Sequence, residues 1–372
     1  MKNVGISMKV SVNQSELTHA LNTVVKGSSS RSTLSILSGI LIQARDGEIV
    51  LQTTNLELSI RVILPALVEE SGDTVVPAKL FSDIVKNLPD MAVSISTNET
   101  TATIFCNNTT YSLKTLNPLD FPLFPEVDAD QEISFPFDVF SSMVKSTAKT
   151  VSRDESHPVL TGILIAQTGN SLKMVATDSY RLAVAEVTLD TVPSRQFEAV
   201  ISGSFLQDIT ALPSSTDPIV IALNENQIVV TYQNATFINR RIEGNFPNYN
   251  QLLSTDYTTK ITLSRSELMD AIRRVSLLSN KVSPVQVSVD AEAGIVTLIS
   301  TSQDVGNAQE SLVCTVEGES VDIAFNYSFM LDGLSSMRSE EITFNLLGAM
   351  KPGVLQATGE ENFLYLIMPV RF

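Results

Sequence analysis

The stretch LSGILI at residues 37–42 recurs as LTGILI at residues 160–165, 123 positions further along the chain. At the same offset, Asn55 in a Thr-Asn-Leu sequence matches Asp178 in a Thr-Asp-Ser sequence. Several matches in one order and at one spacing indicate an internal repeat. A period of about 120 residues is too long for a solenoid unit and is the size of a domain.

A second pattern extends the repeat to a third copy. The segments 76–84, 201–209 and 325–333 resemble one another around one aspartate each. These aspartates are Asp83, Asp208 and Asp332, and we expect them to be structural. The sequence therefore predicts three homologous domains over residues 1–127, 128–255 and 256–372, with Pro-aromatic linkers near 121–125 and 246–249.

Each predicted domain combines two helices with about eight strands. Capping boxes open the first and third long helices, at Asn13-x-x-Glu16 and Ser264-x-x-Glu267, whereas Pro136 gives the middle one a different start. Such a mixture favours an α+β domain with its helices on one side of antiparallel sheets. We expect long helices over 14–26, 138–150 and 265–275, and shorter ones over 78–87, 204–211 and 327–337.

Composition excludes several classes of protein. The chain has 372 residues, 43% of them hydrophobic, which is too apolar for a disordered protein. Two cysteines cannot form a disulfide framework, the two histidines have no metal-site or triad spacing, and no nucleotide-binding motif occurs. We therefore expect no catalytic residue, no metal and no cofactor. The start of the chain has no signal-peptide pattern and no membrane span is visible, so we expect a cytoplasmic protein.

Charge is distributed unevenly along the chain. The net charge is −16, which by itself argues against binding to nucleic acid. The six predicted helices, however, carry 8 basic and 7 acidic residues, whereas the remainder carries 17 and 34. Lys145 and Lys149 share one helix face with serines, a pattern that suits contact with phosphates or is an ordinary solvated face.

Three further features, taken with the threefold repeat, carry a resemblance to a known family. They are a Thr-Asp-x-x-Arg-Leu turn at 177–182, an Asn-Phe-Pro-Asn-Tyr turn at 245–249, and a terminal strand that runs into Met-Pro-x-Arg at 368–371. In this order the chain resembles the bacterial DNA polymerase III beta subunits, the replication sliding clamps, over nearly its whole length. Ser179 stands where the family often carries glycine, which would change the preference for partner peptides.

The resemblance implies a non-enzymatic processivity factor with the DNA clamp fold. Each domain would have two helices on two antiparallel sheets, and a head-to-tail homodimer would form a ring around duplex DNA. The helices would line the hole, and the acidic sheets would form the rim. The implied protein partners are the DNA polymerase III alpha subunit, the clamp loader, other DNA polymerases and repair proteins, which bind through short peptides.

The resemblance also implies two sets of site residues. The peptide groove would comprise Leu160, Thr177, Ser179, Tyr180, Arg181, Leu182, Pro247, Leu252, Asn326, Phe329, Met350, Pro352, Leu366, Met368, Pro369, Val370 and Arg371. The DNA-facing basic residues would be Lys26, Arg31, Lys79, Lys86, Lys145, Lys149, Arg153, Arg265, Arg273 and Arg274.

Two other readings remain open from the residues alone. One is a repeat-built surface or adhesion module, against which the missing signal peptide and the apolar terminal strand count. The other is a hydrolytic enzyme on an unfamiliar α+β fold, against which the lack of a nucleophile–base pairing counts.

Overall fold

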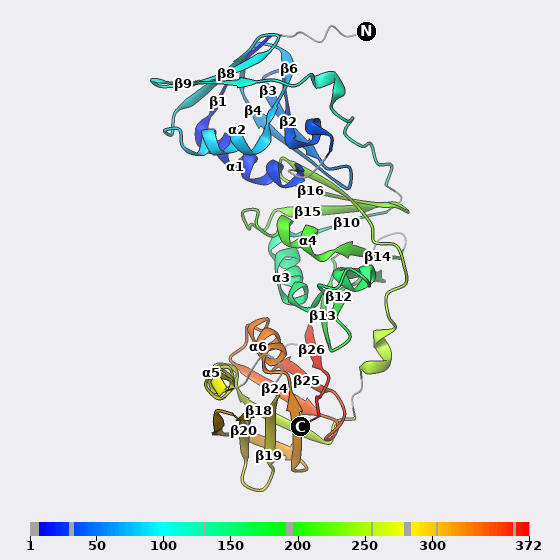
Figure 1. The fold of residues 1–372 in the computed structure, drawn as a ribbon. Coiled ribbons are helices and arrows are strands. Elements are labelled where there is room, and N and C mark those ends of the chain that lie inside the picture. The colour runs from blue at the N-terminus through cyan, green and yellow to red at the C-terminus, as the bar shows by residue number, and fades with distance from the viewer. Residues whose placement is uncertain are drawn as a thin grey trace. The chain divides into compact units, whose positions relative to one another are not determined.

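The computed structural model describes residues 7–29, 33–129, 131–190, 196–253, 256–278, 284–302, 304–359 and 362–371. The chain divides into two compact units, one of residues 1–138 with 212–241 and one of residues 139–211 with 242–372 (Figure 1). The division passes through the second repeat, because strands from two repeats join in one sheet within each unit. The expected domain boundaries after residues 127 and 255 therefore stay a prediction.

The first unit contains two antiparallel sheets. The five-stranded sheet has the order β5-β1-β7-β8-β9, and the eight-stranded sheet has the order β10-β15-β16-β17-β4-β3-β2-β6. Their bounds are β1 Met8–Asn13, β2 Gly39–Arg45, β3 Glu48–Thr54, β4 Leu58–Pro65, β5 Leu67–Glu70, β6 Gly72–Pro77, β7 Ala92–Thr97, β8 Thr101–Cys106, β9 Thr109–Lys114, β10 Gln131–Pro136, β15 Pro218–Leu223, β16 Gln227–Tyr232 and β17 Ala235–Arg240. The helical segments are α1 Gln14–Val24, η1 Val25–Gly27, η2 Ser35–Ser38, α2 Ala78–Lys86 and η3 Pro118–Asp120.

The second unit repeats this organisation. A nine-stranded sheet has the order β14-β11-β12-β13-β26-β25-β24-β18-β22, and a four-stranded sheet has the order β21-β20-β19-β23. The strands are β11 Gly162–Thr168, β12 Ser171–Thr177, β13 Arg181–Thr188, β14 Phe197–Ser202, β18 Thr259–Ser264, β19 Val285–Asp290, β20 Ile295–Ser302, β21 Gly306–Val313, β22 Thr315–Gly318, β23 Val321–Phe325, β24 Glu341–Leu346, β25 Gly353–Ala357 and β26 Phe363–Ile367. The helical segments are α3 Phe137–Thr147 (which begins in the first unit), η4 Ala148–Thr150, η5 Pro158–Thr161, α4 Gly203–Ile209, η6 Tyr249–Leu252, α5 Arg265–Val275, η7 Ser276–Leu278 and α6 Tyr327–Ser335.

The helices begin where the sequence predicts. The side chain of Asn13 accepts hydrogen bonds from the amides of Ser15 and Glu16 at 2.9 and 3.3 Å, and the hydroxyl of Ser264 accepts one from the amide of Glu267 at 3.2 Å. These bonds satisfy amides that a helix start leaves without partners. The middle long helix starts at Phe137 and α4 starts at Gly203, each one residue before the predicted position. Five of the six described helices end one to three residues before the predicted position, and short 3₁₀ turns follow α1 and α3.

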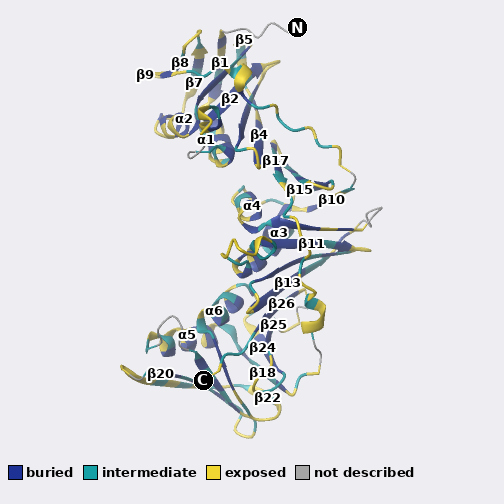
Figure 2. Ribbon diagram, turned by 45° about the vertical axis from the view of Figure 1, so that its right-hand side comes forward, coloured by how far each residue is buried: buried dark blue, intermediate teal, exposed yellow. Residues whose placement is uncertain are grey.

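The core forms because the apolar face of each helix packs on a sheet. Leu17, Leu21 and Val24 of α1 are fully buried, as are Phe140 and Val144 of α3. Figure 2 shows buried residues concentrated along the central strands of the sheets and exposed residues at many turns and outer strands. In the described residues each repeat has two α-helices and eight or nine strands, which confirms the predicted α+β class. In the described part of the chain, no helix is both long enough and apolar enough to cross a membrane.

Sheets continue from one repeat into the next. In the first unit β17 of the second repeat pairs with β4 of the first, for example Phe237 with Ile60. In the second unit β13 pairs with β26 of the third repeat, for example Leu182 with Leu366. Both junctions are antiparallel and main-chain hydrogen-bonded, so each repeat is fastened to the next by a shared sheet.

Candidate functional site

The turn between β12 and β13 is shaped by one aspartate. The carboxylate of Asp178 accepts hydrogen bonds from the amides of Tyr180 and Arg181 at 3.0 and 3.1 Å. Ser179 adopts a left-handed conformation with φ of 75°, which suits glycine better than serine. As a result the ring of Tyr180 is 63% exposed at the tip of the turn.

The matching turn of the first repeat has the same construction. The side chain of Asn55 accepts hydrogen bonds from the amides of Glu57 and Leu58 at 3.0 and 2.7 Å, and Leu56 has φ of 76°. The pairing of Asn55 with Asp178 in the sequence is therefore a true structural equivalence.

Arg181 lies at the centre of a polar network beneath this turn. Its Nε donates to Asp178 at 2.9 Å, and its Nη1 donates to Asp332 at 2.6 Å and to the hydroxyl of Tyr365 at 3.1 Å. Its Nη2 donates to the main-chain oxygen of Lys149 at 2.7 Å. One side chain therefore joins the second repeat to α6 and β26 of the third.

The surroundings of Arg181 keep it charged. Its side chain is only 9% exposed, and burial alone would lower its pKa, but contacts with Tyr365, Asp332 and Asp178 outweigh burial, so the net pKa is raised. Burial raises the pKa of Tyr365, and that hydroxyl remains protonated at neutral pH. The guanidinium carbon also lies 4.3 Å from the centre of the Phe329 ring, a cation–π contact.

The terminal strand is tied to this turn by main-chain hydrogen bonds. β26 runs beside β13, and beyond it the amide of Met368 donates to the main-chain oxygen of Tyr180 at 2.8 Å. The amide of Val370 donates to the oxygen of Ala324 at 2.9 Å. Residues 363–370 are therefore fixed by main-chain bonds to both repeats.

Only part of the predicted peptide groove is brought together by direct contacts. Tyr180 stacks on Phe329 with ring centres 6.5 Å apart, and Met368 and Arg181 border the same place. Leu182 and Leu366, each 1% exposed, are core residues in a cluster with Val354, so neither offers an accessible wall to the predicted groove.

The other predicted groove residues have separate local settings. Thr177 donates its hydroxyl to the main-chain oxygen of Arg181 at 2.7 Å, and Asn326 caps α6. Leu252 and Met350 are 43% and 59% exposed. Among the described residues, no hydrogen bond, ion pair or ring contact links these two, or Leu160, Pro352, Pro369 and Arg371, to Tyr180 or Phe329.

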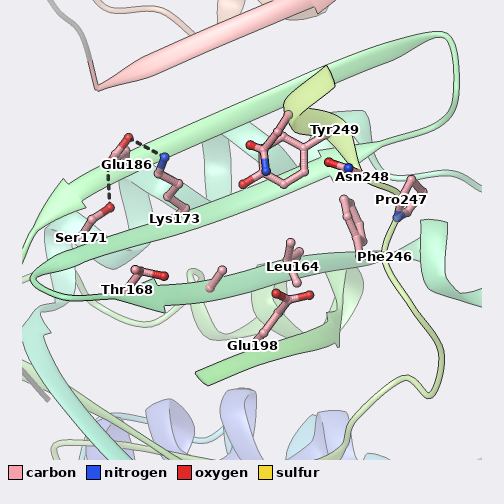
Figure 3. Close-up of a pocket in the computed structure, with 12 residues that line it drawn as sticks. Leu164, Thr168, Ser171, Lys173, Glu186, Glu198, Phe246, Pro247, Asn248 and Tyr249 are labelled. Atoms are coloured by element: carbon pink, nitrogen blue, oxygen red, sulfur yellow. Dashed lines mark hydrogen bonds and ion pairs between the residues drawn. The ribbon is translucent and has the colours of Figure 1, made fainter. Parts of the chain in front are cut away.

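The second unit also contains a hollow of about 560 Å³ that the sequence did not predict (Figure 3). It lies between β11–β13 and the segment 246–250, and it contains Pro247 of the predicted groove. At one end Lys173 and Glu186 form an ion pair at 3.3 Å, and at the other end lie Phe246 and Pro247. Its floor lies on strands of the sheet and its cover comes from the linker, so only tertiary packing creates it.

The predicted DNA-facing residues of the second unit fall into two groups. All three on α5 are ion-paired: Arg265 with Glu340, Arg273 with Asp270 and Arg274 with Glu310, at 3.7, 2.9 and 2.5 Å. In contrast, Lys145, Lys149 and Arg153 are exposed and make no ion pair with any described carboxylate.

The remaining basic residues lie in the first unit or fall outside the description. Lys79 and Lys86 are exposed on α2, and Lys26 lies in η1. Arg31 lies outside the described residues.

Comparison with known proteins agrees with the threefold repeat. Family models of the DNA polymerase III beta subunit match the chain in three consecutive parts: the N-terminal domain over residues 8–125, the central domain over 134–248 and the C-terminal domain over 250–371. The three matches occur in the order of the repeats and cover nearly the whole chain.

Individual relatives span the same length. The beta sliding clamp of Staphylococcus aureus strain Mu50 is 33% identical over 362 residues, which are 94% of this chain and 96% of that protein. The beta sliding clamp of Staphylococcus epidermidis is 32% identical over 375 residues, 98% of this chain and 99% of that protein.

Solved structures show the same fold. The crystal structure of the DNA polymerase sliding clamp from Bacillus subtilis matches with a TM-score of 0.93 at 30% identity, covering 98% of this chain and 99% of the other. The putative DNA polymerase III beta subunit from Eubacterium rectale matches with a TM-score of 0.91, also at 30% identity, covering 98% and 100%. The chain therefore belongs to the family of DNA polymerase III beta subunits, the bacterial DNA sliding clamps.

Proposed function

We propose that two copies of this clamp join head to tail into a closed ring around duplex DNA, and that the ring holds the replicative polymerase on its template. The single observation that carries this proposal is the pattern of sheet edges that one copy leaves unpaired.

The repeats define two kinds of edge strand. The first kind ends the strand series β1-β7-β8-β9 of the first repeat, and it is β9 there, β17 in the second repeat and β26 in the third. The second kind ends the strand series β6-β2-β3-β4 of the first repeat, and it is β4 there, β13 in the second repeat and β21 in the third. Within the chain, one edge of each kind pairs at each junction, β17 with β4 and β26 with β13.

Two edges of complementary kind remain. Among the described residues, β9 and β21 each have a neighbour on one side only. Unpaired edge strands expose main-chain donors and acceptors that favour pairing with another chain. A second copy offers β21 to β9 and β9 to β21, so two identical junctions close a ring of six repeats.

Exposed apolar side chains lie beside both edges. Leu277 in η7, which packs against β20 and β21, is 82% exposed. Phe105 on β8, the neighbour of β9, is 47% exposed. Large exposed apolar side chains at an unpaired edge are typical of an interface between subunits.

The mass in solution tests the ring. We expect the wild type to sediment as a dimer of the 40.4 kDa chain, and Leu277→Asp to sediment as a monomer because a carboxylate would be buried at the junction. Leu123→Asp is the matched control, since Leu123 is 94% exposed in the linker and lies on neither edge strand. A wild type that stays monomeric at micromolar concentration would refute the ring.

We propose that DNA contacts come from the helices and the loop that follows η4. Lys26, Lys79, Lys86, Lys145 and Lys149 supply positive charge on the helices, and Arg153 supplies it in the loop. The α5 arginines face carboxylates and contribute less. Contacts to phosphates alone carry no sequence preference, which suits a ring that slides. The acidity of the remaining surface limits binding of DNA elsewhere.

The place where Tyr180 stacks on Phe329, beside the main chain of Met368, is the proposed docking site for partner peptides. These side chains offer an accessible apolar surface, and the network around Arg181 holds their backbone in place. An apolar site with a few fixed polar groups suits a short peptide with large hydrophobic residues. By family resemblance the peptides belong to the polymerase alpha subunit, the clamp loader, other polymerases and repair proteins.

Fluorescence anisotropy of a labelled peptide rich in Gln, Leu and Phe tests this docking site. We expect saturable binding by the wild type and at least tenfold weaker binding by Tyr180→Ser, about the loss of 1.4 kcal/mol or more that a central aromatic contributes. Leu123→Ser is the control for an exposed apolar side chain elsewhere. Equal affinity of all three proteins would place the site elsewhere.

The role proposed here is non-catalytic, and its setting is the cytoplasm, where a bacterial clamp meets DNA. The proposed domains are residues 1–127, 128–255 and 256–372.

A further inference from the structure

A second hollow, of about 530 Å³, lies within the second unit where helices of the second and third repeats meet. Its walls carry three basic side chains, Lys145 and Lys149 from α3 and η4 and Arg338 from the loop after α6. Five hydroxyl side chains, among them Thr210 and Ser335, line the remainder together with Gln207 and Met337, and none of the described lining residues is acidic. In a chain with 41 acidic and 25 basic residues, such a lining is a local reversal of charge.

The positive charges in this hollow are not neutralised by carboxylates in the described part of the chain. Lys149 donates from Nζ to the hydroxyl of Ser335 at 2.8 Å, which uses one of its three N–H groups. Lys145 and Arg338 make no ion pair with a described carboxylate. Several donors therefore remain for a ligand that is anionic and rich in oxygen.

The walls are held together by the network around Arg181. Arg181 bonds the main-chain oxygen of Lys149 at 2.7 Å and the carboxylate of Asp332 at 2.6 Å. The hydroxyl of Ser335 in turn donates to the main-chain oxygen of Asp332 at 2.9 Å. Hydrogen bonds between Lys149, Ser335, Asp332 and Arg181 thus join the two sides of the hollow that come from different repeats, while the side chains of Lys145 and Arg338 stay exposed.

We propose that this hollow is a seat for one phosphate group of the DNA backbone, with Arg338 as a principal ligand. Arginine presents paired N–H donors that match phosphate oxygens, and lysine adds a point charge. Hydroxyl donors complete a sequence-independent phosphate site. The proposal rests on the proposed DNA clamp function and adds to it a defined contact at the joint between the second and third repeats.

The lining contributed by the third repeat is not reproduced in the second repeat. The residues that occupy the positions of Ser335 and Arg338 in the second repeat, counted from the repeated aspartate, are Ala211 and Ser214. Neither can supply a charge, so we expect no equivalent seat from the second repeat.

The experiment is a salt titration of duplex binding, read by anisotropy of a labelled duplex of about 25 base pairs with the full-length protein. Each neutralised phosphate contributes about 0.9 to the slope of log K against log salt. Arg338→Gln should lower the slope by about that amount, so the loss of affinity between 50 and 200 mM salt shrinks about three- to fourfold relative to the wild type. Lys260→Gln is the control, because it removes the same charge from β18, where Lys260 faces Glu317 at 3.3 Å.

The outcomes separate this seat from the proposed function. A slope reduced by Arg338→Gln but not by Lys260→Gln supports the seat. Equal slopes for Arg338→Gln and the wild type overturn the seat and leave the clamp function standing. Failure of the wild type to bind duplex overturns both, and unchanged binding of the labelled peptide by Arg338→Gln verifies that the variant is folded.

Discussion

Replacing Arg181 by methionine tests whether the polar network beneath the 177–182 turn fastens the second repeat to the third. Methionine keeps most of the side-chain volume but removes the charge and every donor. The change leaves the carboxylate of Asp178, whose side chain is 14% exposed, without its cation. It also leaves Asp332, the hydroxyl of Tyr365 and the main-chain oxygen of Lys149 without a donor.

The magnitude follows from the exposure of each partner. Removing one member of a buried ion pair costs about 3–5 kcal/mol, but the side chain of Asp332 is 39% exposed and its share is nearer that of a surface pair, about 0.5–1 kcal/mol. The pair with Asp178 and the lost bond to Lys149 add about 2–3 kcal/mol. We therefore expect a loss of about 3 kcal/mol in the free energy of opening at the β13–β26 junction.

Hydrogen exchange measured by mass spectrometry, on peptides that cover β13 and β26, reads this opening directly. Exchange in Arg181→Met should be about a hundredfold faster than in the wild type, since each 1.4 kcal/mol is a factor of ten. Arg181→Lys keeps the charge but loses the planar guanidinium group, and its exchange rate should lie between those of the wild type and Arg181→Met. The control, Lys260→Met, breaks an exposed ion pair and should change the free energy of opening by less than about 1 kcal/mol. Exchange in Arg181→Met within threefold of the wild type would refute the reasoning.

Two further predictions concern the third repeat. Hydrogen bonds from Ser266 and Ser264, with Arg265 nearby, lower the pKa of Glu340 to about 2, below the usual value of about 4.3. Because the unfolded state binds the proton more tightly, this stabilisation is complete above about pH 5 and is lost as the pH falls towards 2. As the pH is lowered over this range, the urea midpoint of Glu340→Gln should therefore fall less steeply than that of the wild type. Parallel profiles of the two proteins would contradict the assignment. Gly333 lies on α6, where an added Cβ atom would lie only 2.4 Å from the ring of Tyr365. Despite the better helix propensity of alanine, Gly333→Ala should lower stability by about 1–3 kcal/mol, because the ring must leave its place beside Arg181; a melting temperature equal to or above that of the wild type would show that the site relaxes freely.

Local features of this protein were predictable from the order of its residues. The helix starts at Asn13 and Ser264, the turn at Asp178 and the apolar faces of α1, α3 and α5 depend on residues a few positions apart. Such interactions depend on the spacing and periodicity of residues that are close in the chain, so the sequence alone identifies them. The threefold repeat and the resemblance to sliding clamps also needed only the sequence, and both are confirmed.

Functional geometry depended on contacts between residues far apart in the chain. Arg181 was predicted as a groove residue, but its bond to Asp332, 151 positions away, was not, and Asp332 appeared only as a repeated structural aspartate. Leu182 and Leu366 belong to the core rather than the surface, because the β13–β26 pairing buries them. Arg338 carries no sequence signal at all, since its neighbours in the hollow come from α3, η4 and α4.

The sequence by itself therefore determined the number of repeats, their secondary structure and the family. Tertiary structure alone decided which sheet edges are used and which remain open, which cations are neutralised and where the two hollows lie. The physical reason is that capping, turns and amphipathic periods arise within one stretch of chain, whereas strand pairing across repeats and the clustering of charges arise only when distant stretches pack together.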